Sequence, residues 1–436
     1  MPACRSTGKV GVAGEGAGRM KHEAAMNGYE ACVRCGLCLP ACPTYLETLT
    51  ETSGPRGRIA LIKAVDEGVL DLLSPGFVGQ MSECLDCRAC QAVCPSAVPY
   101  GSMLEEMRAR IEHARSASRP APAHWTRYVL LHWLFAKPAR LRLAASLLRF
   151  AQRSGLATLA GIGGLRDLAR LAPQIPDRYF VPSGGRYEVS RAAGTAMLHA
   201  GCIMHVAFPA VHEATIRMLN RAGLSVVVPA DQGCCGAIAI HAGDDEFARE
   251  AARTNIASFE RSGADVYVVN AAGCGSTLKE YGRLLEGDAG WRERARTFSA
   301  RVRDVTEVLD AMDVPSPPRR IDARVTYQEP CHLVHAQRIS GAPRRLLAKV
   351  EGLELVEMNE SAVCCGSAGI YNLTEPQMAQ RLQARKVGNI EATGATVVAT
   401  ANPGCALQVA AGLRAAGVRA QVKHIVELLD EAYAQA

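Results

Sequence analysis

CVRCGLCLPACP (residues 32–43) and CLDCRACQAVCP (residues 84–95) share the cysteine pattern C-x2-C-x2-C-x3-C-P. This spacing is typical of chains that hold two [4Fe–4S] clusters, in which three close cysteines bind one cluster and the fourth binds the other. By that rule the first cluster has the ligands Cys32, Cys35, Cys38 and Cys94, and the second has Cys42, Cys84, Cys87 and Cys90. Structural zinc also uses C-x2-C pairs, but zinc explains neither the third such step nor the trailing proline. The pattern therefore favours iron–sulfur clusters.

A helical segment is inserted between the two cysteine runs, in ETSGPRGRIALIKAVDEGVLDLL (51–73). Gly54 and Pro55 indicate a turn, and apolar residues then recur at helical spacing (Ile59, Leu61, Ile62, Val65). We expect an α-helical ferredoxin-like domain rather than a compact β-rich ferredoxin. Arg56 and Arg58 either place positive charge near a cluster and raise its potential, or simply begin a solvated helix.

The composition supports metal chemistry in a reducing compartment. The 436 residues include 17 cysteines, eight of them between 32 and 94, eight between 202 and 405, and Cys4. No apolar run reaches the roughly 18–20 residues that span a bilayer, and no secretory signal is evident. A net charge of +6 is far from that of a nucleic-acid binder. Residues 1–19 are expected to be a flexible leader or a mis-assigned start.

The C-terminal half contains an internal repeat. Cys202, Cys234 and Cys274 recur as Cys331, Cys364 and Cys405, at offsets of 129, 130 and 131 residues. Short apolar runs precede these cysteines, and a helical pattern (Val211, Ala214, Thr215, Met218) lies between the first two. Alternating strand and helix patterns predict α/β units with mostly parallel strands, whose sites form at the carboxyl ends of the strands.

Each copy of the repeat offers four thiols to one site. The candidate metal ligands are Cys202, Cys234, Cys235 and Cys274 in the first copy, and Cys331, Cys364, Cys365 and Cys405 in the second. Gly236 and Gly366, which follow the doubled cysteines, permit close approach of the backbone. Four thiolates suit an iron–sulfur cluster or zinc, and a redox-active dithiol is the third alternative.

The spacing C–x31–CCG–x37–C resembles the cysteine-rich CCG domain of heterodisulfide reductase and its relatives. Two such domains behind a two-cluster ferredoxin domain resemble the iron–sulfur subunit of glycolate oxidase (glycolate dehydrogenase). The resemblance covers about residues 20–436, and the most similar motifs are GCIMH (201–205), GCCGAI (233–238), AAGCGSTLKEYG (271–282), EPCHLVHAQ (329–337), CCGSAGIY (364–371) and TANPGC (400–405).

This resemblance and the patterns above predict an α+β multidomain protein. After the leader, the expected domains are a ferredoxin-type 2[4Fe–4S] domain (20–115), a helical connector (116–190), and two α/β CCG domains (191–315 and 322–436). The connector carries Trp125, Tyr128, Trp133 and Phe135 among arginines. It either packs on both neighbours or presents a basic, aromatic surface to a partner or membrane.

The resemblance implies an electron-transfer subunit without substrate-oxidising residues of its own. FAD-bearing partner subunits would oxidise glycolate to glyoxylate, and this chain would pass the electrons toward quinone at the cytoplasmic face of the inner membrane. The alternative is a disulfide or quinone reductase acting at a CCG site, in a related complex for lactate, glycerol 3-phosphate or heterodisulfide. A third hypothesis makes the CCG copies zinc-stabilised docking modules.

Each copy lacks one cysteine of the heterodisulfide reductase pattern. Those domains end in C-x-x-C and use five cysteines for a non-cubane cluster, whereas Thr277 and Gln408 stand at the last position here. His332 and His335 follow Cys331 and would add a ligand or proton relay, unless they are merely hydrogen-bonded. The identity of the metal in the CCG copies therefore stays open at this stage.

Overall fold

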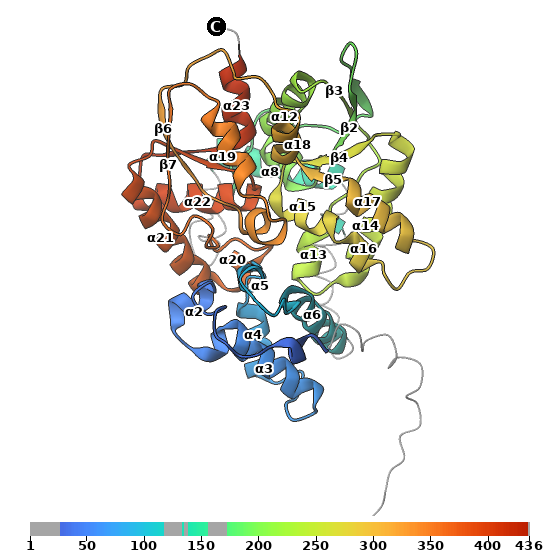
Figure 1. Cartoon of the computed structure of the whole chain (residues 1–436), viewed down its shortest axis with the longest axis vertical. Coiled ribbons are helices and arrows are strands. Elements are labelled where there is room, and N and C mark those ends of the chain that lie inside the picture. The colour runs from blue at the N-terminus through green and yellow to red at the C-terminus, as the bar shows by residue number, and fades with distance from the viewer. Residues whose placement is uncertain (1–26, 117–132, 135–137, 156–171, 435–436) are drawn as a thin grey trace, which may run out of the picture.

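The computed structural model describes residues 27–116, 133–134, 138–155 and 172–434. It places the N-terminal domain beneath two α/β lobes that lie side by side (Figure 1). The described residues thus form three parts, and the α+β multidomain prediction is confirmed.

The N-terminal domain is helical, with no strand among its described residues 27–116. Its elements are η2 (Asn27–Ala31), α2 (Pro43–Thr48), η3 (Glu51–Ser53), α3 (Pro55–Asp66), α4 (Pro75–Glu83), α5 (Ala89–Ala92) and α6 (Tyr100–Ser116). Proline is the first residue of α2, α3 and α4, where its fixed φ suits a helix start and its missing N–H costs nothing. Ile62, Phe77 and Leu104 pack between α3, α4 and α6.

The first α/β lobe contains a five-stranded sheet in the order β1-β3-β2-β4-β5. Its strands are β1 (Gly185–Tyr187), β2 (Gly194–Leu198), β3 (Leu224–Val228), β4 (Val266–Val269) and β5 (Val302–Asp304), and only β1 is antiparallel. Its helices are α11 (Ile203–Ala207), α12 (Pro209–Arg221), α13 (Ala237–His241), α14 (Asp245–Ser262), α15 (Ala272–Lys279), α16 (Tyr281–Leu284), α17 (Arg292–Arg301) and α18 (Val305–Ala311).

The second lobe repeats the order of the four parallel strands β3-β2-β4-β5 in its own parallel sheet, β7-β6-β8-β9. Its strands are β6 (Ala323–Tyr327), β7 (Leu353–Val356), β8 (Val397–Thr400) and β9 (Gln421–His424). Its helices are η5 (His332–Ala336, a π-helix), α19 (Gly341–Ala348), α20 (Tyr371–Thr374), α21 (Pro376–Thr393), α22 (Pro403–Ala416) and α23 (Ile425–Tyr433). The predicted repeat and its parallel strands are therefore confirmed.

The two lobes share one apolar core. Helix α12 packs on α23, and α18 packs on α19, so each lobe contributes one helix to each contact. The apolar faces of these helices and the inner faces of both sheets meet in a single cluster that includes Leu198, Val325 and Leu429. The predicted helical positions Val211, Ala214, Thr215 and Met218 are all buried on α12.

The connector contributes helix α8 (Pro138–Arg153), which buries Leu141 and Ala145 against the first lobe. Trp133 is described and 45% exposed. Trp125, Tyr128 and Phe135 lie outside the described residues.

The N-terminal domain contacts both lobes (Figure 1). Arg88 forms an ion pair with Glu280 of the first lobe, at 2.6 Å. The Tyr371 hydroxyl of the second lobe donates to the carbonyl oxygen of Glu83, at 2.8 Å. The N-terminal domain is therefore held against both lobes by polar side-chain contacts.

His424 joins the two lobes and makes the fold sensitive to acid. Its Nε2–H donates to the Asn270 carbonyl oxygen (3.0 Å), and its Nδ1 accepts the Val426 N–H at the start of α23 (3.2 Å). Burial lowers the pKa of this imidazole to about 4. An unfolded histidine has a pKa of about 6.5, so this stabilisation is present above that pH and is lost as the pH falls toward 4.

We expect His424→Asn, which keeps a side-chain acceptor at the helix start, to weaken the pH dependence of stability. The fall in unfolding free energy between pH 6.5 and 4.5 should become shallower by about 1.4 kcal/mol per pH unit, the contribution of one proton. Denaturant unfolding at several pH values measures this slope. An unchanged slope would show that other groups bind the proton.

Candidate metal centres

The four cysteines expected to hold the first cluster line an open cavity near the surface. They are Cys32, Cys35, Cys38 and Cys94, and Cys90 also reaches this wall. Cys35 is exposed, so this cavity borders solvent. A cube bound here would lie close to the surface of the domain.

The other four N-terminal cysteines line a second, more enclosed cavity. Cys42, Cys84, Cys87 and Cys90 are all buried there. Hydroxyl groups contact two of the sulfur atoms, with Thr44 Oγ1 3.3 Å from Cys42 Sγ and Tyr100 Oη 3.5 Å from Cys84 Sγ. The Tyr100 hydroxyl donates to Cys84 Sγ, whereas the Thr44 hydroxyl donates its proton to the Ser53 carbonyl oxygen (2.6 Å). Hydrogen bonds to the sulfur atoms of a cluster are one of the factors that set its potential.

The two arginines that follow Pro55 lie in different cavities. Arg56 lines the first cavity and pairs with Glu51 at the surface. Arg58 lines the second, is fully buried, and donates to Thr44 Oγ1 (3.1 Å) and Glu83 (2.8 Å). Two hydrogen-bond steps, of 3.1 and 3.3 Å, therefore link its guanidinium to Cys42 Sγ.

We expect Arg58→Met to lower the midpoint potential of the second cluster. A unit charge at about 6 Å and an effective dielectric of about 20 contributes about 2–3 kcal/mol, which corresponds to roughly 100 mV for one electron. An anaerobic redox titration followed by EPR measures the shift. Arg58→Lys keeps the positive charge, so the midpoint potential of the second cluster should stay near the wild-type value. Arg56→Met removes a charge from a solvent-screened pair, so the midpoint potential of the first cluster should shift by less. An unshifted potential in Arg58→Met would remove this role.

In both lobes the strands deliver the predicted cysteines to one edge of the sheet. Cys202 and Cys274 follow β2 and β4, and Cys331 and Cys405 follow β6 and β8. The glycines after the doubled cysteines are left-handed, with φ of +84° at Gly236 and +88° at Gly366. A Cβ on Gly366 would lie 2.6 Å from the Ala379 carbonyl oxygen, so this close approach requires glycine.

The four thiols of each lobe lie close enough to perturb one another. In the first lobe the sulfur atoms of Cys202 and Cys234 are 3.8 Å apart. Neighbouring thiols lower the pKa of Cys234 and Cys365 well below the usual value. The pKa of Cys274 falls to about 6, first through Cys235 and then through His199. The same neighbours and burial raise the pKa of four other thiols, those of Cys202, Cys235, Cys364 and Cys405. Four soft sulfur donors gathered at one place nevertheless form a donor set that suits a metal site.

The residues at the missing fifth cysteine positions are engaged elsewhere. The Thr277 hydroxyl donates to the Gly273 carbonyl oxygen (3.4 Å), and the Gln408 amide donates to the Ala379 carbonyl oxygen (3.4 Å). Each lobe therefore offers four thiols in its CCG set.

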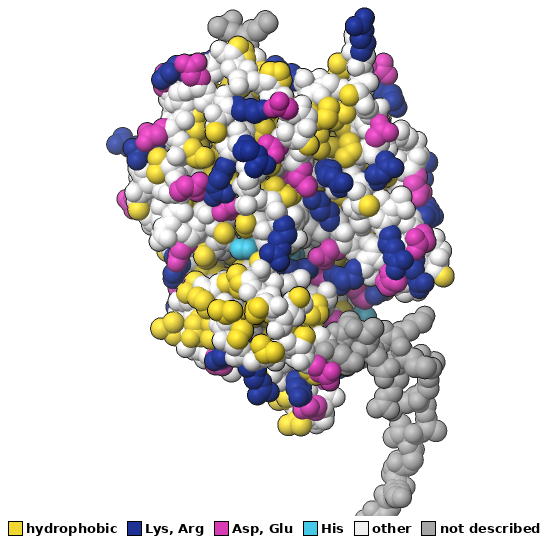
Figure 2. All heavy atoms as spheres, viewed as in Figure 1, with side chains coloured by type: hydrophobic (Ala, Val, Ile, Leu, Met, Phe, Trp, Pro, Cys, Tyr) yellow, Lys and Arg dark blue, Asp and Glu magenta, His cyan; other side chains and the backbone are white. Residues whose placement is uncertain are grey.

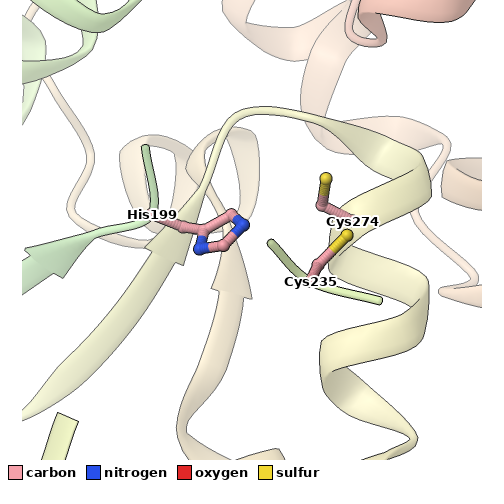
Figure 3. A group of neighbouring side chains, drawn as sticks. All are labelled: His199, Cys235 and Cys274. Carbon is pink, nitrogen blue, oxygen red and sulfur yellow. The ribbon is translucent and has the colours of Figure 1, made fainter. Parts of the chain in front are cut away.

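The two histidines selected from the sequence are bound to backbone. His332 Nε2 lies 2.9 Å from the Asp86 carbonyl oxygen, and His335 Nε2 lies 3.0 Å from that of Ala362. The histidine that does reach a thiol site is His199, beside Cys235 and Cys274 (Figure 3). Sequence reasoning missed it, although its place three residues before Cys202, where the second copy has Gln328, was a readable signal.

The second-lobe site adjoins the second cavity of the ferredoxin domain. Cys87 and Cys364 belong to one buried apolar cluster with Leu85 and Tyr371, and Cys331 packs against it. Burial raises the pKa of Cys87, and the nearby Cys331 raises it further. The first-lobe cysteines pack in a different cluster, with Leu141 of the connector helix. The second lobe is thus the direct neighbour of the ferredoxin domain's buried site.

Comparisons with protein families match every part of this architecture. The 4Fe-4S dicluster domain family matches residues 28–98, and the cysteine-rich (CCG) domain family matches residues 196–279 and 325–410. The linker region of the glycolate oxidase iron-sulfur subunit matches residues 122–173. The chain therefore carries a dicluster ferredoxin domain, and the expected iron–sulfur chemistry is supported.

Similar proteins extend over nearly the whole chain. The probable glycolate oxidase iron-sulfur subunit of Bacillus subtilis is 39% identical over 92% of this chain and 93% of its own length. The glycolate oxidase iron-sulfur subunit of Escherichia coli is 33% identical, with the same coverage. Lactate utilization protein A of an Exiguobacterium species is 30% identical but covers 55% of this chain. The chain belongs to the glycolate oxidase iron–sulfur subunit family.

Proposed function

We propose that this chain is the electron-transfer subunit of a flavin-dependent glycolate dehydrogenase. Oxidation of glycolate to glyoxylate releases two electrons and two protons at an FAD on a partner subunit. The chain then carries the electrons one at a time through iron–sulfur clusters to quinone, which takes up both electrons and two protons. The full-length similarity to glycolate oxidase iron-sulfur subunits supports this substrate, because the lactate-type relative matches a shorter part of the chain.

The arrangement of thiol sites supports an electron relay. Cys32, Cys35, Cys38 and Cys94 would hold a [4Fe–4S] cluster near the surface, and Cys42, Cys84, Cys87 and Cys90 a buried one. Clusters of this kind transfer single electrons without chemistry on the substrate. The second-lobe site, against Cys87, would receive electrons from the buried cluster.

The surface around the first cavity is suited to a partner subunit. Val33, Leu37 and Val93 are 69%, 56% and 45% exposed beside the cysteines of that cavity. Figure 2 shows hydrophobic side chains gathered over the N-terminal domain. We assign this surface to the FAD-bearing subunit. Its apolar side chains can bind a partner, and a partner bound there would lie close to the first cluster.

Anaerobic affinity purification tests the assignment. The tagged chain should recover FAD-containing subunits, and deleting its gene should abolish glycolate-dependent quinone reduction. Leu37→Glu should reduce recovery of the partners, whereas Met312→Glu, at an exposed site on the first lobe, should not. A chain that purifies alone, from cells whose glycolate oxidation survives its deletion, would refute the function.

We place the complex peripherally on the cytoplasmic face of the inner membrane. No helix among the described residues is long and apolar enough to cross a bilayer. Helix α8 exposes Leu143, Leu147 and Phe150 along one side, by 60%, 63% and 66%, and contains four arginines and no acidic residue. Such a helix can lie in an anionic membrane surface.

Vesicle sedimentation checks this placement. The purified complex should bind vesicles of phosphatidylcholine with phosphatidylglycerol better than vesicles of phosphatidylcholine alone, and Leu147→Glu should weaken that binding. Binding that is equal on both lipids and unchanged in Leu147→Glu would exclude α8 as the contact. Loss of FAD-containing partners in this variant would instead assign the helix to a subunit interface.

A further inference from the structure

The second lobe buries a lysine beside the loop that carries its doubled cysteine. Lys386 lies on α21 and is 2% exposed. Its ammonium donates to the carbonyl oxygens of Glu360 and Ser361, at 2.6 and 3.1 Å. These two residues begin the loop that leads to Cys364 and Cys365. Lys386 therefore holds this loop in place and brings a positive charge to it.

The charge of Lys386 is not neutralised by a carboxylate. Lys386 forms no ion pair within the part of the chain that the structure describes. The Glu360 carboxylate pairs instead with Arg385, at 2.6 Å, and accepts from the Asn389 amide, at 3.1 Å. A buried charge without a counter-charge is costly, so this ammonium calls for an anion nearby.

The thiol site of the second lobe is placed to be that anion. Val387, the residue after Lys386, packs in one buried cluster with Cys365 and Cys405. Burial lowers the pKa of Lys386, and the thiolates of the site are the strongest influences that oppose this effect, Cys365 first. The lysine and the thiol site therefore stabilise each other's charge.

The first lobe has a neutral amide at the matching place. Helices α14 and α21 each end at a left-handed glycine, Gly263 and Gly394, and counting back from both aligns Asn255 with Lys386. The Asn255 amide donates to the Cys234 carbonyl oxygen, at 2.9 Å. Both side chains thus hold the loop of a doubled cysteine, but the one in the second lobe is a cation.

We propose that Lys386 raises the reduction potential of the second-lobe site, and so makes this lobe rather than the first the electron acceptor of the ferredoxin domain. A centre held by four thiolates is negatively charged and gains a further charge on reduction, so a buried cation favours its reduced form. One electron moves, and the buried ferredoxin cluster is oxidised as the second-lobe centre is reduced. The cation lies in the lobe that adjoins Cys87. This role rests on the electron relay proposed above and names the residue that directs it.

An anaerobic redox titration of the full chain, with chemical mediators and EPR detection, tests this role. The second-lobe signal is the one that Cys364→Ser abolishes. Lys386→Gln keeps a hydrogen-bond donor and removes the charge. The equilibrium constant for reducing the second-lobe site should therefore fall at least about tenfold, a shift of about 59 mV for one electron. Arg385→Gln is the matched control and should shift this potential less, because its charge is paired with Glu360 and its side chain is 32% exposed.

A shift in Lys386→Gln no larger than that in Arg385→Gln overturns the proposal. So does a chain in which Cys364→Ser abolishes no signal, because its second lobe then holds no redox centre. Should Lys386→Gln fail to fold, the wild type decides: its second-lobe site should be reduced at a higher potential than the buried cluster, and the reverse order counts against the role. Mediators rather than glycolate set the potential, so a different substrate for the complex would refute the proposed function and leave this result standing.

Discussion

Replacing Cys364 with serine is expected to stop electron flow beyond the ferredoxin domain. Cys364 lies in the same buried cluster as Cys87 of the second cavity, and Cys331 of the same site packs against it. In the proposed relay the second-lobe site would take the electron from the buried cluster first, because electron tunnelling falls steeply with distance and the two sets of cysteines share this apolar cluster. Loss of one thiolate would remove a ligand from that proposed site and would break the proposed relay there.

The measurement starts from chain reduced with dithionite and follows reoxidation by a water-soluble quinone. In Cys364→Ser dithionite should still reduce the ferredoxin clusters. Their reoxidation should fall to the slow rate at which these clusters react directly with the quinone. The matched variant is Cys234→Ser in the first lobe, which should retain most of the rate. Equal losses in the two variants would place both lobes on the route, and an unchanged rate in Cys364→Ser would take the second lobe off it.

Arg88→Met is expected to destabilise the chain by about 3–5 kcal/mol, the usual cost of leaving buried charges without their partner. The Arg88 side chain is 6% exposed and pairs with Asp86, Glu105 and Glu280, at 3.3, 2.5 and 2.6 Å. A Cβ on Gly101 would lie 2.3 Å from its Nε, so a glycine makes room for it. The substitution would leave the buried Asp86 without its guanidinium partner, and Glu105 and Glu280 would keep only the partly exposed Arg283.

Denaturant unfolding gives the free energy, and hydrogen exchange should show faster opening of α6 and α16, which carry or adjoin the paired carboxylates. Arg283→Met is the control, because Arg283 pairs with Glu105 and Glu280 but is 42% exposed. A screened pair of that kind contributes at most about 1 kcal/mol. If Arg88→Met costs no more than Arg283→Met, the buried network does not hold the domains together.

Much of the architecture could be predicted from local pattern. The two x2 spacings within Cys32–Cys38 and within Cys84–Cys90 are typical of a chain segment that folds around one centre, so the grouping of these cysteines needs little knowledge of the rest. The repeat and its parallel strands follow from apolar runs that each end at a cysteine. Gly236 and Gly366 were chosen for close backbone approach, and both adopt the left-handed conformation that only glycine takes easily.

The tertiary structure alone decided how the sites relate to one another. His332 and His335, chosen for their nearness to Cys331 in sequence, bind carbonyl oxygens, whereas His199 meets Tyr267 and Cys274 across 68 and 75 residues. Cys87 and Cys364 share one buried apolar cluster between two domains, and Arg88 reaches Glu280 in a third part of the chain. Residue spacing sets which atoms share a turn or a strand end, because covalent geometry acts over a few residues. Which of two equivalent lobes meets a cluster depends on side-chain packing between distant surfaces, and no local pattern carries that information.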